Sequence, residues 1–108
     1  MSNLSAHVLD TRWGVPASGV ELHLSTAAGE HLASGTTDAD GRIRDLGPQT
    51  LDPGDYRITF ETGDYFAASD QATFFPRITV DFTVGSAQEH YHVPLLLSPF
   101  AFSTYRGS

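Results

Sequence analysis

Apolar and polar residues alternate with a period of two along most of this chain. The clearest stretch is 78–84, where isoleucine, valine and phenylalanine alternate with threonine and aspartate. The same pattern runs through 4–9, 20–24 and 56–61. Successive side chains of a strand point to opposite faces, so each stretch is expected to form a strand with one buried and one wetter face.

The stretch 63–74 breaks this alternation. Asp64 is placed to cap a short helix that continues through Gln71 and must end before Pro76. Turn sequences containing glycine or proline separate the other stretches. One short helix among seven or eight strands, in a chain of 108 residues, predicts an all-β fold. We expect a β-sandwich of antiparallel sheets that forms a single domain over 1–108.

Charge and composition exclude several kinds of partner. Thirteen acidic residues stand against six arginines and no lysine, which gives a formal net charge of −7. Nucleic acids and anionic membranes require clustered positive charge, so neither is expected as a partner. The chain shows no bilayer-spanning stretch, secretion signal or nucleotide-binding fingerprint, which favours a cytoplasmic protein without a nucleotide cofactor. The absence of cysteine excludes disulfides, thiolate metal sites and a cysteine nucleophile.

Histidines are the first candidates for chemistry. His90 and His92 are two positions apart, so on a strand both would point to the same face. Tyr91 and Val93 alternate with them and are expected to face the core. His7 lies on the more polar face of the first predicted strand, and the three imidazoles would gather if these faces converge. Neutral imidazoles can take a proton from water or hold a zinc ion that acidifies water.

Both uses of the histidines stay open at this point. A zinc-dependent hydrolase would employ His90, His92 and a third ligand, and a chelator would abolish its activity. An isolated histidine on the outer face of a strand is usually a solvated side chain. His23 and His31 have no partner in sequence and are therefore assigned to the surface.

The stretch 37–42 is the second candidate, because it contains Asp-x-Asp-Gly, as at the start of a calcium-binding loop. That pattern needs a glutamate six residues after the glycine, where this chain has Gly47. A hairpin turn is the simpler interpretation, with Gly41 at positive φ. Arg42 follows directly, and its planar guanidinium suits a carbonyl group or an anionic ring.

The end of the chain is unusually aromatic. A predicted strand over 90–97 is followed by a Ser-Pro break and by the sequence Phe-Ala-Phe-Ser-Thr-Tyr-Arg-Gly-Ser over 100–108. Exposed chain ends tend to be polar and frayed. We therefore expect the last strand to be docked, with another subunit as one candidate surface.

Three stretches together carry a resemblance to a known family. They are His-Val-Leu-Asp-Thr and Gly-Val-Pro-Ala within 7–17, Thr-Asp-Ala-Asp-Gly-Arg at 37–42, and 90–108 with its closing Tyr-Arg-Gly-Ser. On these residues the chain resembles the transthyretin-related family over essentially its full length. It is most similar to the enzyme branch of that family, the 5-hydroxyisourate hydrolases, for which the closing tetrapeptide is specific.

The resemblance implies a prealbumin-like β-sandwich of two four-stranded sheets with one short helix. It implies a homotetramer, a dimer of dimers, with active sites in a channel at the dimer–dimer interface. It also implies hydrolysis of a small-molecule substrate, 5-hydroxyisourate, to 2-oxo-4-hydroxy-4-carboxy-5-ureidoimidazoline, a step in urate degradation. No cofactor and no metal are implied.

The resemblance assigns roles position by position. His7 and His92 match the two catalytic histidines, and Arg42 matches the arginine of the middle motif. The closing tetrapeptide matches residues that line the same site: Tyr105, Arg106, Gly107 and Ser108. Ser108 is grouped with the catalytic residues, and the other three with substrate binding. Phe102 departs from the pattern, since the family often has tyrosine there.

These residue types suit the hydrolysis of a cyclic amide. One histidine of the His7/His92 pair would take a proton from the attacking water, and Arg42 would offset charge on the carbonyl oxygen. Which histidine acts as the base is left open. The other alternative is a transthyretin-like carrier of a small ligand, for which an apolar channel is expected.

Overall fold

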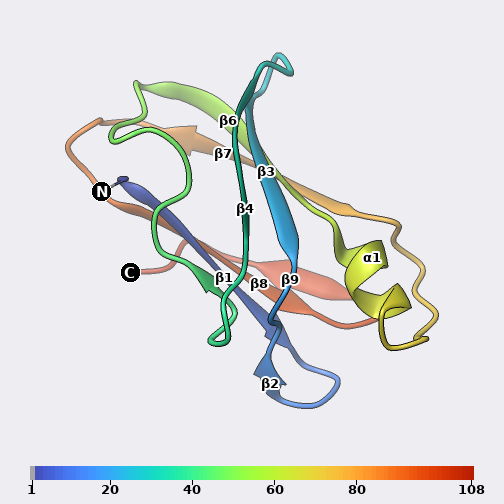
Figure 1. The fold of residues 1–108 in the computed structure, drawn as a ribbon. Coiled ribbons are helices and arrows are strands. Elements are labelled where there is room, and N and C mark those ends of the chain that lie inside the picture. The colour runs from blue at the N-terminus through green and yellow to red at the C-terminus, as the bar shows by residue number, and fades with distance from the viewer. Residues whose placement is uncertain (1) are drawn as a thin grey trace.

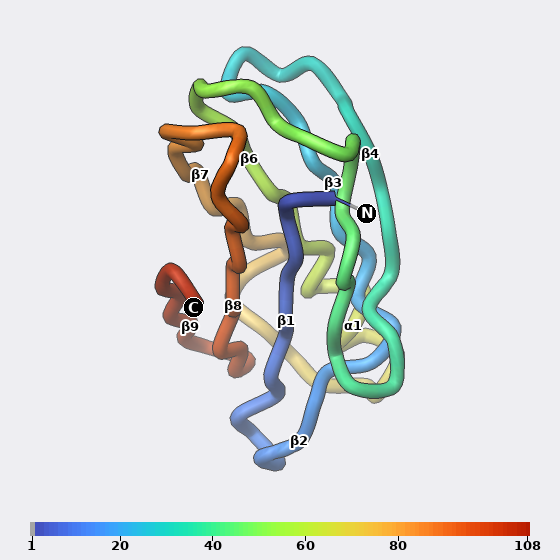
Figure 2. The backbone as a smooth tube through the Cα atoms, turned by 90° about the vertical axis from the view of Figure 1, so that its left-hand side faces the viewer, coloured from blue at the N-terminus to red at the C-terminus, as the bar shows by residue number. Residues whose placement is uncertain are grey.

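Two β-sheets packed face to face make up residues 2–108, the part of the chain that this computed structural model describes (Figure 1). The first sheet contains, in spatial order, β2 (Val15–Pro16), β1 (Leu4–Asp10), β8 (Tyr91–Leu97) and β9 (Phe102–Thr104), with β5 (Arg42–Ile43) also paired to β1. The second sheet contains β4 (His31–Thr36), β3 (Glu21–Thr26), β6 (Gly54–Phe60) and β7 (Ile78–Val84). Figure 2 shows β1 and β8 side by side, with the C-terminus beside β8 and β9.

The β-sandwich is confirmed, but its sheets differ from the expected pair of four-stranded sheets. The first sheet has five strands, because the two short strands β2 and β5 both pair with β1. The expectation of purely antiparallel sheets is also wrong at one place. β1 and β8 run parallel, in register from Leu4 opposite Tyr91 to Asp10 opposite Leu97. Alternation indicates that a strand has two faces but carries no information about the direction of its neighbour.

The helix α1 spans Thr62–Ala67, so it begins and ends earlier than expected. Asp64 lies in its first turn, and Glu61 occupies the cap position without a side-chain capping bond. The buried ring of Phe66 holds this turn against the core. Beyond Ala67 the chain leaves the helix through a turn in which Asp70 has a φ of 56°. Within residues 2–108, no helix is long and apolar enough to cross a membrane.

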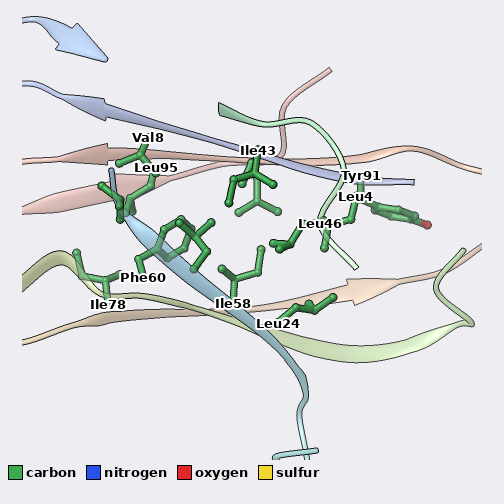
Figure 3. Packing of buried hydrophobic residues seen from close by; sticks show 14 of the residues in the cluster. Leu4, Val8, Leu24, Ile43, Leu46, Ile58, Phe60, Ile78, Tyr91 and Leu95 are labelled. Carbon is green, nitrogen blue, oxygen red and sulfur yellow. The ribbon is translucent and has the colours of Figure 1, made fainter. Parts of the chain in front are cut away.

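The core lies between the sheets and is built from the alternating apolar residues of both (Figure 3). Tyr91 and Val93 are buried, as the spacing of the neighbouring histidines predicts. Val80 and Phe82 are only partly buried, because β7 is the edge strand of its sheet. The predicted core residues that are fully or almost fully buried are Leu4, Ala6, Val8, Val20, Leu22, Leu24, Ile58, Phe60, Ile78 and Val84.

Candidate active site

The candidate site lies on the outer face of the first sheet, where β1 runs between β5 and β8. On this face Ser5 is opposite His92 of β8, and His7 is opposite Arg42 of β5. Side chains of paired residues in neighbouring strands project to the same side of a sheet. The convergence of the two histidine-bearing faces is therefore observed: the rings of His7 and His92 lie 6.4 Å apart between centroids.

A pocket with a volume of about 310 Å³ opens beside these strands. It is lined mainly by polar and charged side chains: Ser5, Ala6, Arg42, Ile43, Arg44, His90, His92 and Ser108. Three of the predicted catalytic residues, Arg42, His92 and Ser108, thus share one cavity. His7 stands next to the pocket without lining it.

The turn between 37 and 42 places Arg42 at this pocket. One oxygen of Asp38 accepts hydrogen bonds from the backbone N–H groups of Asp40 at 2.8 Å and Arg42 at 3.0 Å. These bonds hold the pKa of the Asp38 carboxyl below its usual value, with the bond from Arg42 as the main cause. Gly41 has a φ of 74°, and a Cβ atom there would lie 2.4 Å from the carbonyl oxygen of Val8. The predicted turn with Gly41 at positive φ is therefore confirmed, and glycine is required in it. The turn is not the expected hairpin, because it joins β4 of the second sheet to β5 of the first, and these two strands do not pair with each other.

The hydrogen bond of His7 defines the tautomer of its neutral ring. Its Nε2 atom lies 2.9 Å from the backbone carbonyl oxygen of Asp40. A carbonyl oxygen only accepts, so Nε2 must carry the proton, and the lone pair of the neutral ring is on Nδ1. His7 therefore ties β1 to the turn that carries Arg42.

Ser5 is a further candidate site residue, which the sequence interpretation missed. Its hydroxyl lies 2.8 Å from Nδ1 of His92 and 2.9 Å from Nε2 of His90. One hydroxyl thus connects the two histidines of the spaced pair. The Nε2 atom of His92 makes no hydrogen bond to any residue in the range 2–108. The one available signal for Ser5 was that it shares a strand face with His7.

The surroundings of His92 favour its neutral form. Its half-buried position lowers the pKa of the imidazole below the usual 6.5, because burial penalises the charged ring. The positive charge of Arg42, and that of His7 and His90 when protonated, lowers this pKa further. At neutral pH His92 is therefore an uncharged imidazole that can accept a proton.

Gly107 passes directly over the His92 ring. Its N–H donates a 2.8 Å hydrogen bond to the carbonyl oxygen of His92. A Cβ atom at position 107 would lie 2.4 Å from Cδ2 of that ring. Glycine is thus the residue that lets the terminal segment cross the imidazole and bring Ser108 into the pocket.

Tyr105 and Arg106, both expected to bind substrate, lie along a neighbouring pocket of about 270 Å³ that shares His92 as a lining residue. The Arg106 guanidinium lies 4.7 Å from the ring centre of Tyr91 and contacts Glu89 at 3.2 Å. In this structure these contacts attach the terminal segment to β8. They do not bring Arg106 to the lining of the first pocket.

The aromatic terminus is docked within its own chain, since β9 pairs antiparallel with β8. The ring of Phe102 packs edge-to-face on that of Phe75, with centroids 5.2 Å apart. Phe102 is nevertheless 40% exposed and Tyr105 is 58% exposed. Another subunit as a docking surface stays a prediction.

A zinc site at His90 and His92 would need a third ligand. Among residues 2–108 no group of three or more histidine, cysteine, aspartate or glutamate side chains is arranged to hold a metal ion. The facing nitrogens of His90 and His92 instead share the hydroxyl of Ser5. The arrangement is one of imidazoles, arginines and hydroxyls around a polar cavity.

Together, the fold and the site define a class: a two-sheet β-sandwich with a polar, imidazole-containing pocket on the outer face of one sheet. Residues 4–107 match the model of the HIUase/Transthyretin family, and the chain belongs to that family.

Relatives on both branches of the family are similar to this chain. A 5-hydroxyisourate hydrolase of Salmonella typhimurium is 50% identical, over 97% of this chain and 80% of its own length. The structure of Klebsiella pneumoniae 5-hydroxyisourate hydrolase has a TM-score of 0.90 and 44% identity, covering 97% of this chain and 98% of its own. The structure of transthyretin from Sparus aurata has a TM-score of 0.89 and 34% identity, covering 99% of this chain and 97% of its own. The backbone is thus nearly as similar to this transthyretin as to the hydrolase, so the fold alone does not distinguish the two.

Proposed function

We propose that this protein is an enzyme that hydrolyses 5-hydroxyisourate to 2-oxo-4-hydroxy-4-carboxy-5-ureidoimidazoline in urate degradation. The observation that carries the proposal is the pairing of a neutral imidazole, His92, with the guanidinium of Arg42 at one polar cavity. The names of its similar relatives from Salmonella typhimurium and Klebsiella pneumoniae support the same substrate. A channel for an apolar ligand would need apolar walls, which this pocket lacks.

The geometry favours His92 over His7 as the general base. His92 lines the cavity and its lowered pKa keeps it neutral, whereas His7 does not line the cavity and its Nε2–H is used to bind the backbone carbonyl oxygen of Asp40. In the proposed reaction, Nε2 of His92 takes a proton from water as the water oxygen bonds to the ring carbonyl carbon. Arg42 donates hydrogen bonds to the oxygen on which negative charge develops.

Collapse of this tetrahedral intermediate breaks the carbonyl C–N bond. The leaving nitrogen receives the proton from the imidazolium of His92, which restores the neutral base. The new carboxylic acid ionises at neutral pH, so the product carries a carboxylate that Arg42 and Arg44 both attract. Ser108, which lines the pocket, holds water or substrate through its hydroxyl. No metal or cofactor takes part in the proposed steps.

The proposal includes assembly as a homotetramer in the cytoplasm, with two dimers enclosing the sites. Large exposed aromatic side chains support association, because such groups are usually covered by a partner. They include Trp13, Phe74 and Phe100, which are between 65% and 76% exposed in the single chain. Analytical ultracentrifugation tests this part: a monomer at micromolar concentration would contradict it.

The activity is tested by generating 5-hydroxyisourate with urate oxidase and following its ultraviolet decay with and without this protein. Spontaneous decay is the baseline, and each reaction is run with and without a chelator. Acceleration that survives the chelator is the expected result. Acceleration lost to the chelator would favour the zinc alternative, and folded protein without any acceleration would favour the carrier.

A further inference from the structure

We infer that Ser5 and His90 are positioning residues that hold His92 in the one tautomer able to act as a base. The inference rests on the proposed function, since it concerns the same hydrolysis. It starts from the shared hydroxyl of Ser5, which lies within hydrogen-bond distance of both imidazoles.

A serine hydroxyl has one hydrogen, so it can donate to only one of the two ring nitrogens. It must accept from the other for both hydrogen bonds to exist. Ser5, His90 and His92 therefore have two possible arrangements of hydrogen bonds. In the second arrangement, donor and acceptor are exchanged in both bonds. Each arrangement fixes the proton position on both rings, because a neutral imidazole carries its single proton on one nitrogen.

The first arrangement produces a base. Ser5 donates to Nε2 of His90 and accepts from Nδ1–H of His92. The proton of His92 is then on Nδ1, and its lone pair is on Nε2, the nitrogen without a hydrogen bond to residues 2–108. The second arrangement reverses both bonds and places the proton of His92 on Nε2. That nitrogen then cannot take a proton from water.

A neutral His90 can accept from Ser5 and so permits the first arrangement, whereas a protonated His90 excludes it. A protonated His90 carries hydrogens on both nitrogens, so it can only donate to Ser5 and enforces the second arrangement. His90 is exposed and can exchange protons with solvent. A protonated His90 would therefore inactivate His92 through Ser5.

Several charged groups face these two rings and act on the same equilibrium. His7 lies on β1, beside the strand of His92, and Arg42 lies on β5, beyond β1; both disfavour the charged form of His92. The Arg106 guanidinium lies 3.4 Å from the carbonyl oxygen of His90, and Glu89 contacts that guanidinium. Ser108 lines the same pocket. These surroundings are kept constant when only Ser5 or His90 is changed.

The structure contains an internal control. On the second sheet the hydroxyl of Ser34 lies 2.7 Å from Nδ1 of His23 and 2.8 Å from Nε2 of His31, the same sharing of one hydroxyl by two imidazoles. None of these three residues lines the polar pocket. Substitution of Ser34 therefore repeats the chemical change made at Ser5 at a place without a reacting group.

The first test is the tautomer of His92, read from its ring nitrogens by ¹⁵N NMR at neutral pH without substrate. We expect protonated Nδ1 and unprotonated Nε2 in the unchanged protein and in Ser5→Thr, which keeps the hydroxyl. Ser5→Ala should yield a mixture of tautomers, whereas Ser34→Ala should leave His92 unchanged. A predominantly Nε2-protonated His92, or no effect of Ser5→Ala, would overturn the inference.

The second test uses activity. Ser5→Ala should lower kcat by about tenfold to a hundredfold, as is typical when a partner that orients a functional imidazole is lost, with KM nearly unchanged. Ser5→Thr should restore kcat, and Ser34→Ala should have no effect. Circular dichroism of each variant checks folding.

His90 provides the final comparison. His90→Gln retains an uncharged acceptor for Ser5 and should keep activity. His90→Lys can only donate and should be slow at every pH. Equal activity of these two variants would overturn the inference. If the unchanged protein does not accelerate hydroxyisourate decay, the proposed function fails, while the NMR result still decides the tautomer.

Discussion

Two clusters of the type histidine–serine–histidine occur in this small fold. They share the same central hydrogen bonds, but the residues around them differ. In one, Ser5 joins His90 and His92; in the other, Ser34 joins His23 and His31. All four distances fall between 2.7 and 2.9 Å. The hydrogen-bond motif alone therefore does not make a catalytic site.

The surroundings separate the two clusters. His92 has Arg42 nearby and Gly107 across its ring, and it lines a polar cavity. His23 instead faces carboxylates, with Glu21 at 3.3 Å and Glu61 at 3.7 Å. Carboxylates favour the charged form of an imidazole and cations disfavour it. The comparison shows what makes His92 a candidate base: a neighbouring positive charge and a position in a cavity, in addition to its hydrogen bond.

The largest expected effect comes from replacing the proposed base. His92→Asn should lower kcat by about 10²- to 10⁴-fold, the usual contribution of a positioned general base. His23→Asn is the matched control from the second cluster and should leave kcat unchanged. Both are measured in the urate oxidase-coupled assay. Equal losses in the two variants would show that the clusters do not differ in function.

The next effect tests the enclosure of His92. Gly107→Ala places a Cβ atom 2.4 Å from Cδ2 of the ring, so the ring or the terminal segment must move. Displacement of about 1 Å can cost on the order of a hundredfold in rate, and we expect a loss between tenfold and that value. Gly85→Ala is the control, because no atom lies within 4 Å of a Cβ at that position. A fully active Gly107→Ala would contradict the close packing.

The pH dependence of the rate should follow the protonation of His92 and should not depend on the second cluster. Burial and Arg42 lower the pKa of His92 below 6.5, and only the neutral ring accepts a proton. The rate should therefore stay level from pH 8 to about 6.5 and fall at lower pH, by about tenfold per unit once well below that pKa. Stopped-flow measurement of kcat/KM in His23→Asn should yield the same curve. A rate that is flat down to pH 5 would exclude His92 as the base.

The smallest expected effect is in the second cluster itself. Ser34→Ala removes two exposed side-chain hydrogen bonds far from the pocket and should change the free energy of unfolding by no more than about 0.5 kcal/mol. Urea denaturation followed by circular dichroism measures this change. A large destabilisation would mean that the second cluster is a structural element rather than an ordinary surface feature.

Much of the fold could be predicted from the sequence, because the pleat of a strand imposes a local period of two. The buried faces of β1, β3 and β6 follow from this period, and the turn at Gly41 follows from the Asp-Gly sequence. The start of α1 could not be predicted, since the buried ring of Phe66, rather than a capping side chain, positions that helix. The short strands β2 and β5 were missed for a related reason, since two residues are too few to display a period.

The candidate site was predicted in part. His92 was singled out by its spacing from His90, and Arg42 by the turn that precedes it. Together with His7, both matched residues of the transthyretin-related family. Ser5 carries no such signal, because a serine in a strand is ordinary until its neighbours are known. The structure separates Arg106 from the first pocket through its contacts with Tyr91 and Glu89, which residue order could not show.

By itself, the sequence determined which residues face the core, which segments turn, and which family the chain resembles, since these depend on local periodicity and short motifs. The tertiary structure alone decided that β1 lies parallel to β8, and this pairing brings Ser5 to His92 across most of the chain's length. Backbone hydrogen bonds between strands are the same for every residue type, so the register is set by the packing of whole sheets rather than by any local pattern.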